Sequence, residues 1–150
     1  MKLIDDLSRN CGVAKNFGAL HDYKVRDLGE LTDKTAIELA DELWVIEKQP
    51  QKGDFVDTAS EYFIPKADIA VITSSAEINK SVERLLELSH GLTILIGPST
   101  PMSPVLFDYG VDMLAGIKVV DEEGMMAKIA EGGGKVSQFE DAIEFLVMER

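Results

Sequence analysis

The apolar positions of the chain follow two different spacings that alternate along its length. Residues 68–73 and 92–96 are almost uniformly apolar, which is typical of strands in a parallel sheet that is covered on both faces. Between these runs, Ile78, Val82 and Leu86 follow the 3.6-residue period of a helix. The spacing therefore predicts a strand, a helix and a second strand in succession.

Similar segments lie on both sides of this unit. We predict further strands at residues 23–29, 43–47 and 113–120, and further helices at residues 32–43, 54–63, 103–110 and from residue 121. The signals at the helix ends are residues with capping side chains, Pro at a first helical position and Gly after the last one. Residues 143–148 fit a final helix as well as a final strand, and this choice stays open.

Strands that alternate with helices imply a parallel sheet with right-handed crossovers and helices on both faces. The predicted fold class is α/β, a Rossmann-like three-layer α/β/α arrangement with a mostly parallel sheet of about five or six strands. With 150 residues, the chain is expected to form a single domain over residues 1–150. Residues 1–22 are expected to be a weakly organised N-terminal segment.

The charge of the chain narrows the classes of partner. Its formal net charge is −12 at pH 7, and the few Lys and Arg residues are scattered among acids. Nucleic-acid binders usually carry a basic footprint, so we expect no nucleic acid and no anionic membrane as a partner. No apolar run approaches the ~20 residues of a membrane span, and Asp5 and Asp6 argue against a signal peptide. The predicted location is the cytoplasm.

Small and polar residues follow two of the predicted strands, where the carboxyl ends of parallel strands form a ligand crevice. Hydroxyls and N–H groups at helix N-termini there could hold a phosphate or a carboxylate. The expected ligand-binding residues are Glu47, Thr73, Ser74, Ser75, Asn79, Gly97, Pro98, Ser99, Thr100 and Ser103. A structural alternative stays open. In it, Ser74 and Ser103 only cap helices, Ser74 in a capping box with Glu77, and Glu47 pairs with Lys48 or solvent.

Motifs for specific chemistry are absent from the sequence. It contains neither the Gly-x-Gly-x-x-Gly fingerprint of dinucleotide binding nor the Gly-x-x-x-x-Gly-Lys loop of ATPases. Cys11, His21 and His90 are far apart in sequence, so we assign no metal ligands, while Asp108 and Asp112 leave a hard cation open. No nucleophile–base pair or acid–base pair is identifiable, so the catalytic residues and the cofactor stay unassigned.

A series of motifs in a fixed order carries a resemblance to a known family. The motifs are Gly97–Pro104, Phe107–Asp112, Ala115–Gly116, Val120–Asp121 and Glu131–Gly134, within a segment from about Leu43 to Lys135. This segment resembles the C-terminal Rossmann-like domain of the putative heavy-metal chelation family, whose function is not settled. Members of that family usually carry an additional N-terminal domain similar to the small domain of enolase, with a proposed site between the two domains.

The resemblance implies that this chain holds the Rossmann-like half and lacks the N-terminal domain. We therefore expect a small-molecule or anion-binding module, as half of a composite site linked to metal or metal-chelate handling. The alternative is a non-catalytic interaction subunit or homo-oligomeric scaffold with a degenerate site, because residues 25–31 are polar where the family has an apolar strand. An enzyme of unknown reaction is the third hypothesis. Exposed edge strands favour a homodimer. A separate partner protein could also supply the missing N-terminal domain.

Overall fold

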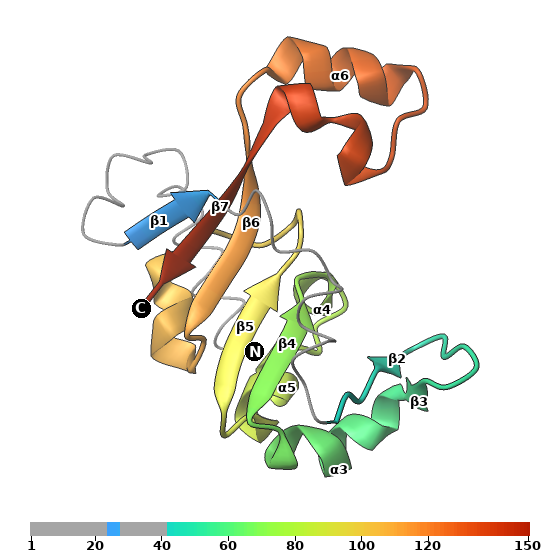
Figure 1. The fold of residues 1–150 in the computed structure, drawn as a ribbon, viewed down its shortest axis with the longest axis vertical. Helices are drawn as coiled ribbons and strands as arrows, with labels where there is room; N and C mark the ends of the chain where they lie inside the picture. Colours follow the sequence, from blue (N-terminus) through green and yellow to red (C-terminus); the bar gives the residue numbers. More distant parts are fainter. Residues whose placement is uncertain (1–23, 28–41) are drawn as a thin grey trace.

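The computed structural model describes residues 24–27 and 42–150, which form two sheets and several short helices (Figure 1). The strands are β1 (Lys24–Asp27), β2 (Ile46–Glu47), β3 (Phe55–Val56), β4 (Ile69–Thr73), β5 (Leu92–Ile96), β6 (Met113–Val119) and β7 (Ile143–Glu149). The α-helices are α3 (Ser60–Phe63), α4 (Ser75–Ile78), α5 (Val82–Leu88) and α6 (Glu122–Ala130), and the 3-10 helices are η3 (Asp57–Ala59), η4 (Ile64–Lys66), η5 (Pro104–Tyr109), η6 (Val136–Gln138) and η7 (Glu140–Ala142). None of the helices in these ranges has the length and apolar composition of a membrane span. The predicted N-terminal segment 1–22 and the helix predicted at residues 32–43 fall outside the described residues, apart from the last two positions of that helix.

The main sheet has five strands in the order β1-β7-β6-β5-β4. β4, β5 and β6 run parallel to one another, with Ile69 opposite Leu92 and Ile94 opposite Met113. β7 lies antiparallel to both β6 and β1. The α/β class is confirmed, but the prediction of a mostly parallel sheet is wrong, because two of the four pairs of neighbouring strands are antiparallel.

The change of strand direction arises in the segment between β6 and β7. This segment contains α6, η6 and η7, which lie together beyond the end of the sheet (Figure 1). No residue of α6 is buried, so this helix does not pack on the sheet as a crossover helix would. The chain instead returns on itself, and residues 143–149 form a strand, which decides between the two alternatives for the tail.

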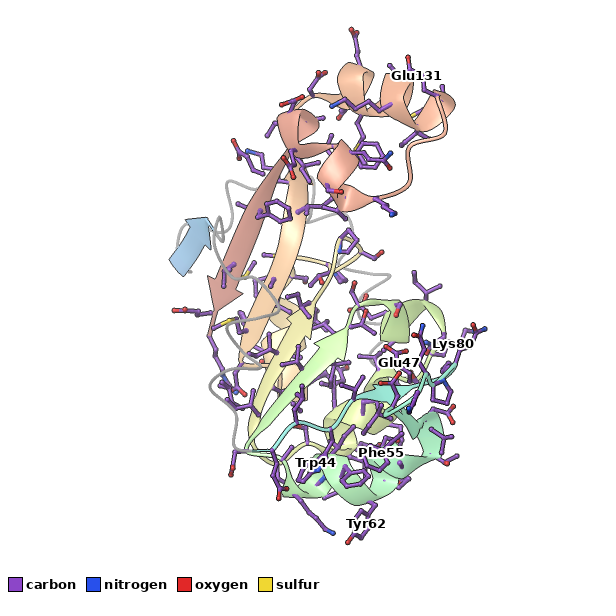
Figure 2. All side chains as sticks on the ribbon, turned by 45° about the vertical axis from the view of Figure 1, so that its right-hand side comes forward. Trp44, Glu47, Phe55, Tyr62, Lys80 and Glu131 are labelled. Carbon is purple, nitrogen blue, oxygen red and sulfur yellow. The ribbon has the colours of Figure 1, made fainter. Side chains whose placement is uncertain are left out.

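The buried strand predicted at residues 43–47 is wrong in extent and in place. Only its last two residues form β2, which pairs in parallel with β3 in a separate two-stranded sheet, and Leu43 is 53% exposed. The segment packs through aromatic rings instead. The ring centroid of Phe63 lies 4.9 Å from that of Trp44 and 4.5 Å from that of Phe55. Figure 2 labels Trp44 and Phe55 in this segment. This aromatic contact holds β2 and β3 on α3 rather than in the main sheet.

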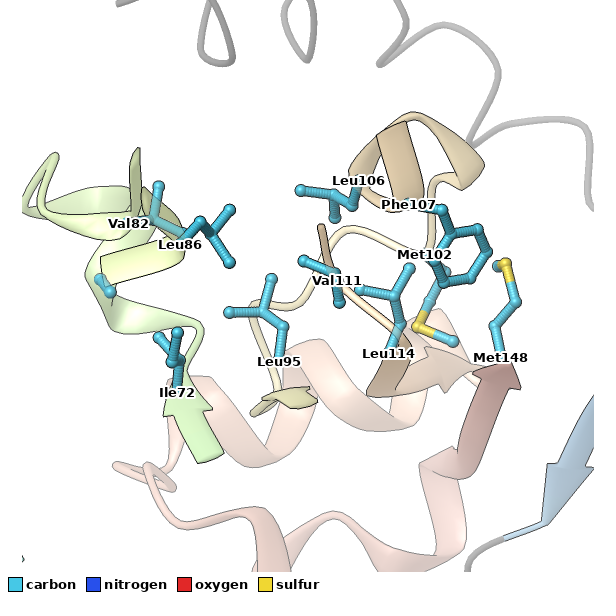
Figure 3. Close-up of a cluster of buried hydrophobic side chains, with 11 residues drawn as sticks. Ile72, Val82, Leu86, Leu95, Met102, Leu106, Phe107, Val111, Leu114 and Met148 are labelled. Carbon is cyan, nitrogen blue, oxygen red and sulfur yellow. The ribbon is translucent and has the colours of Figure 1, made fainter. Parts of the chain in front are cut away.

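The hydrophobic core lies on one face of the main sheet, under α5 and η5 (Figure 3). Its buried side chains are Ile72, Ala76, Val82, Leu86, Leu95, Met102, Leu106, Phe107, Val111, Leu114 and Met148. The opposite face of β4 and β5 presents Ile69, Val71, Leu92 and Ile96, which are between 39% and 59% exposed. In the described part of the chain, a packed core therefore covers only one face of these two strands.

The helix predicted after β4 is divided into α4 and α5 by a tight turn. In this turn the Asn79 Oδ1 accepts a hydrogen bond from the Ser81 N–H (3.1 Å), and Lys80 has a φ of 64°. A left-handed residue ends one helix and lets the chain begin another. A predicted helix end is confirmed, since η5 ends before Gly110, whose φ is 91°. The helix predicted from residue 121 begins at Glu122, and the Asp121 carboxylate caps it by accepting a backbone N–H (2.9 Å).

Candidate functional site

The loops that follow β4 and β5 lie next to each other at one edge of the main sheet (Figure 1). The two strands are parallel, and their last residues, Thr73 and Ile96, are opposite each other in the pairing. The first loop leads into α4, and the second contains residues 97–103 and leads into η5. We call these two loops the carboxyl edge. Most of the ligand-binding residues expected from the sequence lie there, because parallel strands end at the same side of a sheet.

Ser74 and Gly97 join the two loops of the carboxyl edge. Ser74 is 2% exposed, and its N–H donates a hydrogen bond to the Ile96 carbonyl oxygen (2.8 Å). Gly97 has a φ of 143°, and its own N–H donates to the Ala115 carbonyl oxygen of β6 (3.0 Å). A side chain at position 97 would collide with the Ser74 hydroxyl. Both space and backbone conformation therefore require glycine here.

The turn from Gly97 to Thr100 forms the tip of the second loop. The Thr100 N–H donates to the Gly97 carbonyl oxygen (3.0 Å), which closes a four-residue turn with Pro98 and Ser99 exposed at its tip. Thr100 itself is 6% exposed, and its Oγ1 atom is buried without a hydrogen-bond partner among the described residues. Buried polar atoms in native proteins nearly always have a partner, so the unpaired hydroxyl makes Thr100 a candidate for contact with a water or a ligand.

Glu77 of α4 is a second polar group at this edge. Its Oε1 atom is buried and has no hydrogen-bond partner in the part of the chain that the structure describes. Burial raises the pKa of Glu77 from its ordinary value of 4.5 to about 7, because the charged carboxylate loses hydration. A large share of these side chains is then protonated at neutral pH and can donate a hydrogen bond. The predicted capping box is not formed, since Ser74 makes no side-chain bond at the start of α4.

Other residues predicted for the site take part in local contacts. The hydroxyls of Thr73 and Ser75, both exposed, lie 3.2 Å apart. Asn79 uses its Oδ1 to accept from both the N–H (3.1 Å) and the hydroxyl (2.6 Å) of Ser81. Ser103 precedes η5, but no side-chain bond caps that helix. α4 is only four residues long, so the helix dipole on which the sequence argument relied is weak here.

Glu47 and Asp112 lie outside the two loops of the carboxyl edge. Glu47 is the exposed last residue of β2, in the separate two-stranded sheet. Asp112 lies at the amino end of the parallel strands, where its Oδ2 accepts a hydrogen bond from the Thr93 N–H (2.8 Å). Residues 24–27 and 42–150 contain no group of three or more His, Cys, Asp or Glu that could hold a metal ion. The donors present in these ranges therefore do not fit a heavy-metal centre.

The sequence alone does not predict the roles of Glu77 and Gly116 at the carboxyl edge. Glu77 is predicted from sequence only as a capping partner, and nothing in the sequence signals that its Oε1 is buried without a partner. Gly116 of β6 lies against Thr100. A Cβ atom at position 116 would lie 3.3 Å from the Thr100 carbonyl oxygen and 3.4 Å from its Cβ. A glycine inside an otherwise apolar strand is the signal for such a close approach.

Comparison with known proteins identifies the relatives of this chain. Residues 25–148 match the DUF364 family, which is described as "Putative heavy-metal chelation". The chain belongs to the DUF364 family. It is similar to a DUF364 protein of unknown function from Desulfitobacterium hafniense DCB-2, whose crystal structure matches with 34% identity over 72% of this chain and a TM-score of 0.65. No match was found among curated proteins.

A second crystal structure supports the same fold. It is of a DUF364 protein of unknown function from Pyrococcus horikoshii and matches with 20% identity over 92% of this chain and a TM-score of 0.72. The chain covers 44% of the length of the Desulfitobacterium protein and 64% of that of the Pyrococcus protein. Both DUF364 relatives therefore contain residues outside the matched segment. The family match also confirms the resemblance that the sequence motifs indicated.

Proposed function

We propose that this DUF364 chain binds a small molecule through a carboxylate, phosphate or similar polar group at the carboxyl edge. The observation that carries the proposal is the pair of buried oxygens, Thr100 Oγ1 and Glu77 Oε1, that have no partner among the described residues. They follow two adjacent parallel strands, so a ligand over this edge meets both loops. An unpaired buried polar group costs about 1–3 kcal/mol, and a ligand that pairs with it removes this cost.

The two oxygens contribute differently to binding. A hydroxyl both donates and accepts, so Thr100 serves a charged as well as a neutral ligand oxygen. Glu77 donates only when it is protonated, which its pKa of about 7 allows at neutral pH. An anion therefore binds more tightly below pH 7, where the carboxylate charge is removed, whereas a cation binds more tightly above it. The exposed hydroxyls of Thr73 and Ser75, which lie 3.2 Å apart where β4 leads into α4, are further donors.

Titration of the full chain with inorganic phosphate, and separately with citrate, tests the proposal through backbone amide NMR shifts. We expect shifts concentrated at Ser74, Glu77, Gly97 and Thr100, with a dissociation constant of about 1 mM or below. Thr100→Val should weaken binding about tenfold because it removes the hydroxyl and keeps the shape. Thr58→Val, at an exposed threonine of η3, is the matched control and should bind like the wild type.

A titration with sulfate, which stays a dianion at both about pH 6 and about pH 8, tests the role of Glu77 in anion binding. Tighter sulfate binding at the lower pH supports an anion site that uses protonated Glu77. Shifts that gather only at exposed lysines, or equal weakening by Thr100→Val and Thr58→Val, contradict the proposal. If a divalent cation shifts the same amides, and does so more strongly at the higher pH, the carboxyl edge binds a cation rather than an anion.

The greater length of the relatives supports a composite site. The chain covers 44% and 64% of their lengths, so a further domain or a separate partner would complete the carboxyl edge. The parallel unit β4-β5-β6, with α4 and α5 between β4 and β5, supports a Rossmann-like connection for this part of the sheet. Because the described residues lack a chelating cluster, we propose that any metal reaches this edge as a chelate, whose carboxylates make the contact. The cytoplasm stays a prediction from the sequence.

An interaction subunit is a second candidate function, favoured by the open apolar face of the sheet. Ile69 and Val71 of β4 are 57% and 59% exposed, and Leu92 and Ile96 lie beside them on β5. Exposed apolar surface of this kind marks interaction sites. Native mass spectrometry of the wild type and of Val71→Asp tests the homodimer. A dimer that the variant converts to monomer supports it, while a monomeric wild type leaves a separate partner as the interaction hypothesis.

A further inference from the structure

We infer that Gly116 is a positioning residue of the carboxyl edge, because the absence of a side chain at position 116 lets Thr100 pack closely against β6. This inference rests on the proposed function, in which Thr100 contacts the ligand. Gly116 is buried in the middle of β6 and lies opposite Leu146 of β7 in the pairing. It directly follows Ala115, the last residue of β6 that pairs with β5. Gly116 therefore lies where the turn from β5 passes over β6.

The glycine at position 116 is required for space rather than for backbone freedom. An added Cβ would lie 2.9 Å from the Met102 Sδ, 3.3 Å from the Thr100 carbonyl oxygen and 3.4 Å from the Thr100 Cβ. The φ of Gly116 lies outside the left-handed region, so an alanine can adopt this backbone conformation. A substitution here consequently changes the packing against Thr100 and Met102 without straining β6 itself.

Strand β6 cannot move away from an added methyl group. The Ala115 carbonyl oxygen accepts the Gly97 N–H (3.0 Å) on one side, and Gly116 is paired with β7 on the other. Met102 can turn the far end of its side chain aside, but Thr100 presents its backbone. The methyl group therefore displaces Thr100 by a few tenths of an ångström and weakens its N–H bond to Gly97.

The contact repeats an arrangement one strand further along the sheet. The Ser74 hydroxyl, after β4, lies against Gly97 at the end of β5. Thr100, after β5, lies against Gly116 of β6. In both places a buried hydroxyl residue lies against a glycine in the next parallel strand or directly after it, which brings the loop close to the sheet. Gly97 meets the Ser74 hydroxyl, whereas Gly116 meets the carbonyl oxygen and Cβ of Thr100.

Gly116→Ala in the full chain tests the inference, with Gly134→Ala as the matched control. Gly134 is exposed, and a Cβ there would meet nothing within 4 Å. We expect phosphate binding to Gly116→Ala to be about fivefold weaker than to the wild type, with faster hydrogen exchange at the Thr100 amide. Gly134→Ala should change neither. A merely structural role would lower the melting temperature and leave the phosphate affinity of the folded protein unchanged.

The double variant Gly116→Ala/Met102→Leu keeps the test usable if the single variant does not fold, because it removes the sulfur atom of the tightest contact and keeps the volume of the core. Weak binding in the double variant supports the displacement of Thr100. Full recovery assigns the effect to Met102 and overturns the inference. If the wild type binds neither phosphate nor citrate, the proposed function fails by itself. Exchange at the Thr100 amide then still decides on Gly116, and an unchanged rate overturns its positioning role.

Discussion

A buried threonine lies at each end of β5, and the two differ in whether the hydroxyl has a partner. Thr93, at the amino end, is 1% exposed, and its Oγ1 lies 2.7 Å from the Ser89 hydroxyl and 3.3 Å from the Gly91 carbonyl oxygen. Thr100, beyond the carboxyl end, is 6% exposed, and its Oγ1 has no partner in the described part of the chain. The same kind of side chain is hydrogen-bonded at one end of β5 and has no partner among the described residues at the other.

The difference follows from how the chain enters and leaves a parallel strand. At the amino end, the segment after α5 and the start of β6 bring the Ser89 hydroxyl and the Asp112 carboxylate to Thr93. At the carboxyl end, the chain leaves in a tight turn of glycine and proline whose bonds are made by the backbone. The paired hydroxyl of Thr93 therefore has a structural role, whereas the unpaired hydroxyl of Thr100 is the one on which the proposed binding rests. Substitutions at the two ends should separate these roles.

Asp112→Ala is expected to have the largest effect on stability. Its Oδ2 accepts the Thr93 N–H at 2.8 Å, and the substitution leaves a partly buried N–H without a partner. This should lower the free energy of unfolding by about 2 kcal/mol, measured by urea denaturation. Asp108→Ala, at an exposed acid of η5, is the control and should change it little. Equal unfolding midpoints for the two variants would contradict a structural role for the amino end.

Glu77→Gln tests the carboxyl edge through the pH dependence of stability. Burial raises the pKa of Glu77 from 4.5 to about 7, so between these values the native state holds a proton that the unfolded state has released. The free energy of unfolding therefore falls as the pH rises through this range, and the loss is complete above pH 7. Partial burial and solvent screening reduce the loss to about 1–2 kcal/mol.

The glutamine variant keeps the shape of the side chain and carries no charge. We expect it to be more stable than the wild type by about 1–2 kcal/mol at about pH 8, and equally stable at about pH 4. Glu140→Gln, at an exposed acid of η7, is the matched control. A stability difference that is the same at both pH values would show that the effect of Glu77 does not come from its charge.

Ser89→Ala should have a smaller effect than either of these changes. It removes the hydroxyl that lies 2.7 Å from Thr93 Oγ1 but leaves the Gly91 carbonyl oxygen as an acceptor. Because the buried hydroxyl keeps one partner, the expected loss is about 1 kcal/mol in the free energy of unfolding. Ser137→Ala, at an exposed serine of η6, provides the comparison by urea denaturation. A loss as large as that of Asp112→Ala would mean that Thr93 depends on Ser89 alone.

Local patterns predicted the parts of the fold that depend on neighbouring residues. The strands at residues 68–73 and 92–96, the short helix up to Gly110 and the helix from about residue 121 all follow from spacing and turn residues. The antiparallel direction of β7 did not follow, because it depends on how α6, η6 and η7 return the chain. The place of residues 43–47 also escaped prediction, since the packing of Trp44 and Phe55 on Phe63 decides it.

The sequence predicted where the candidate site lies, but not which of its polar atoms have hydrogen-bond partners. Polar residues after two apolar runs located the carboxyl edge, because parallel strands end together. Whether a given oxygen there is paired depends on contacts between residues far apart in the sequence, such as Thr100 with Gly116. The sequence also placed Asn79 among the ligand-binding residues, whereas its Oδ1 accepts hydrogen bonds within the turn before α5. Whether a single polar atom has a hydrogen-bond partner depends on how distant segments pack together, and the spacing of residues in the sequence does not predict this.

Thr100→Val should have the smallest effect on stability, and this makes it the sharpest test of the comparison. Valine has the shape of threonine, and the hydroxyl that it removes has no partner among the described residues. Without ligand, the free energy of unfolding should therefore stay within about 0.5 kcal/mol of the wild type or rise slightly. Thr93→Val removes a paired hydroxyl by the same change and should lose about 1 kcal/mol. If Thr100→Val loses as much as Thr93→Val, the hydroxyl at the carboxyl end has a structural partner, and the two ends of β5 are alike.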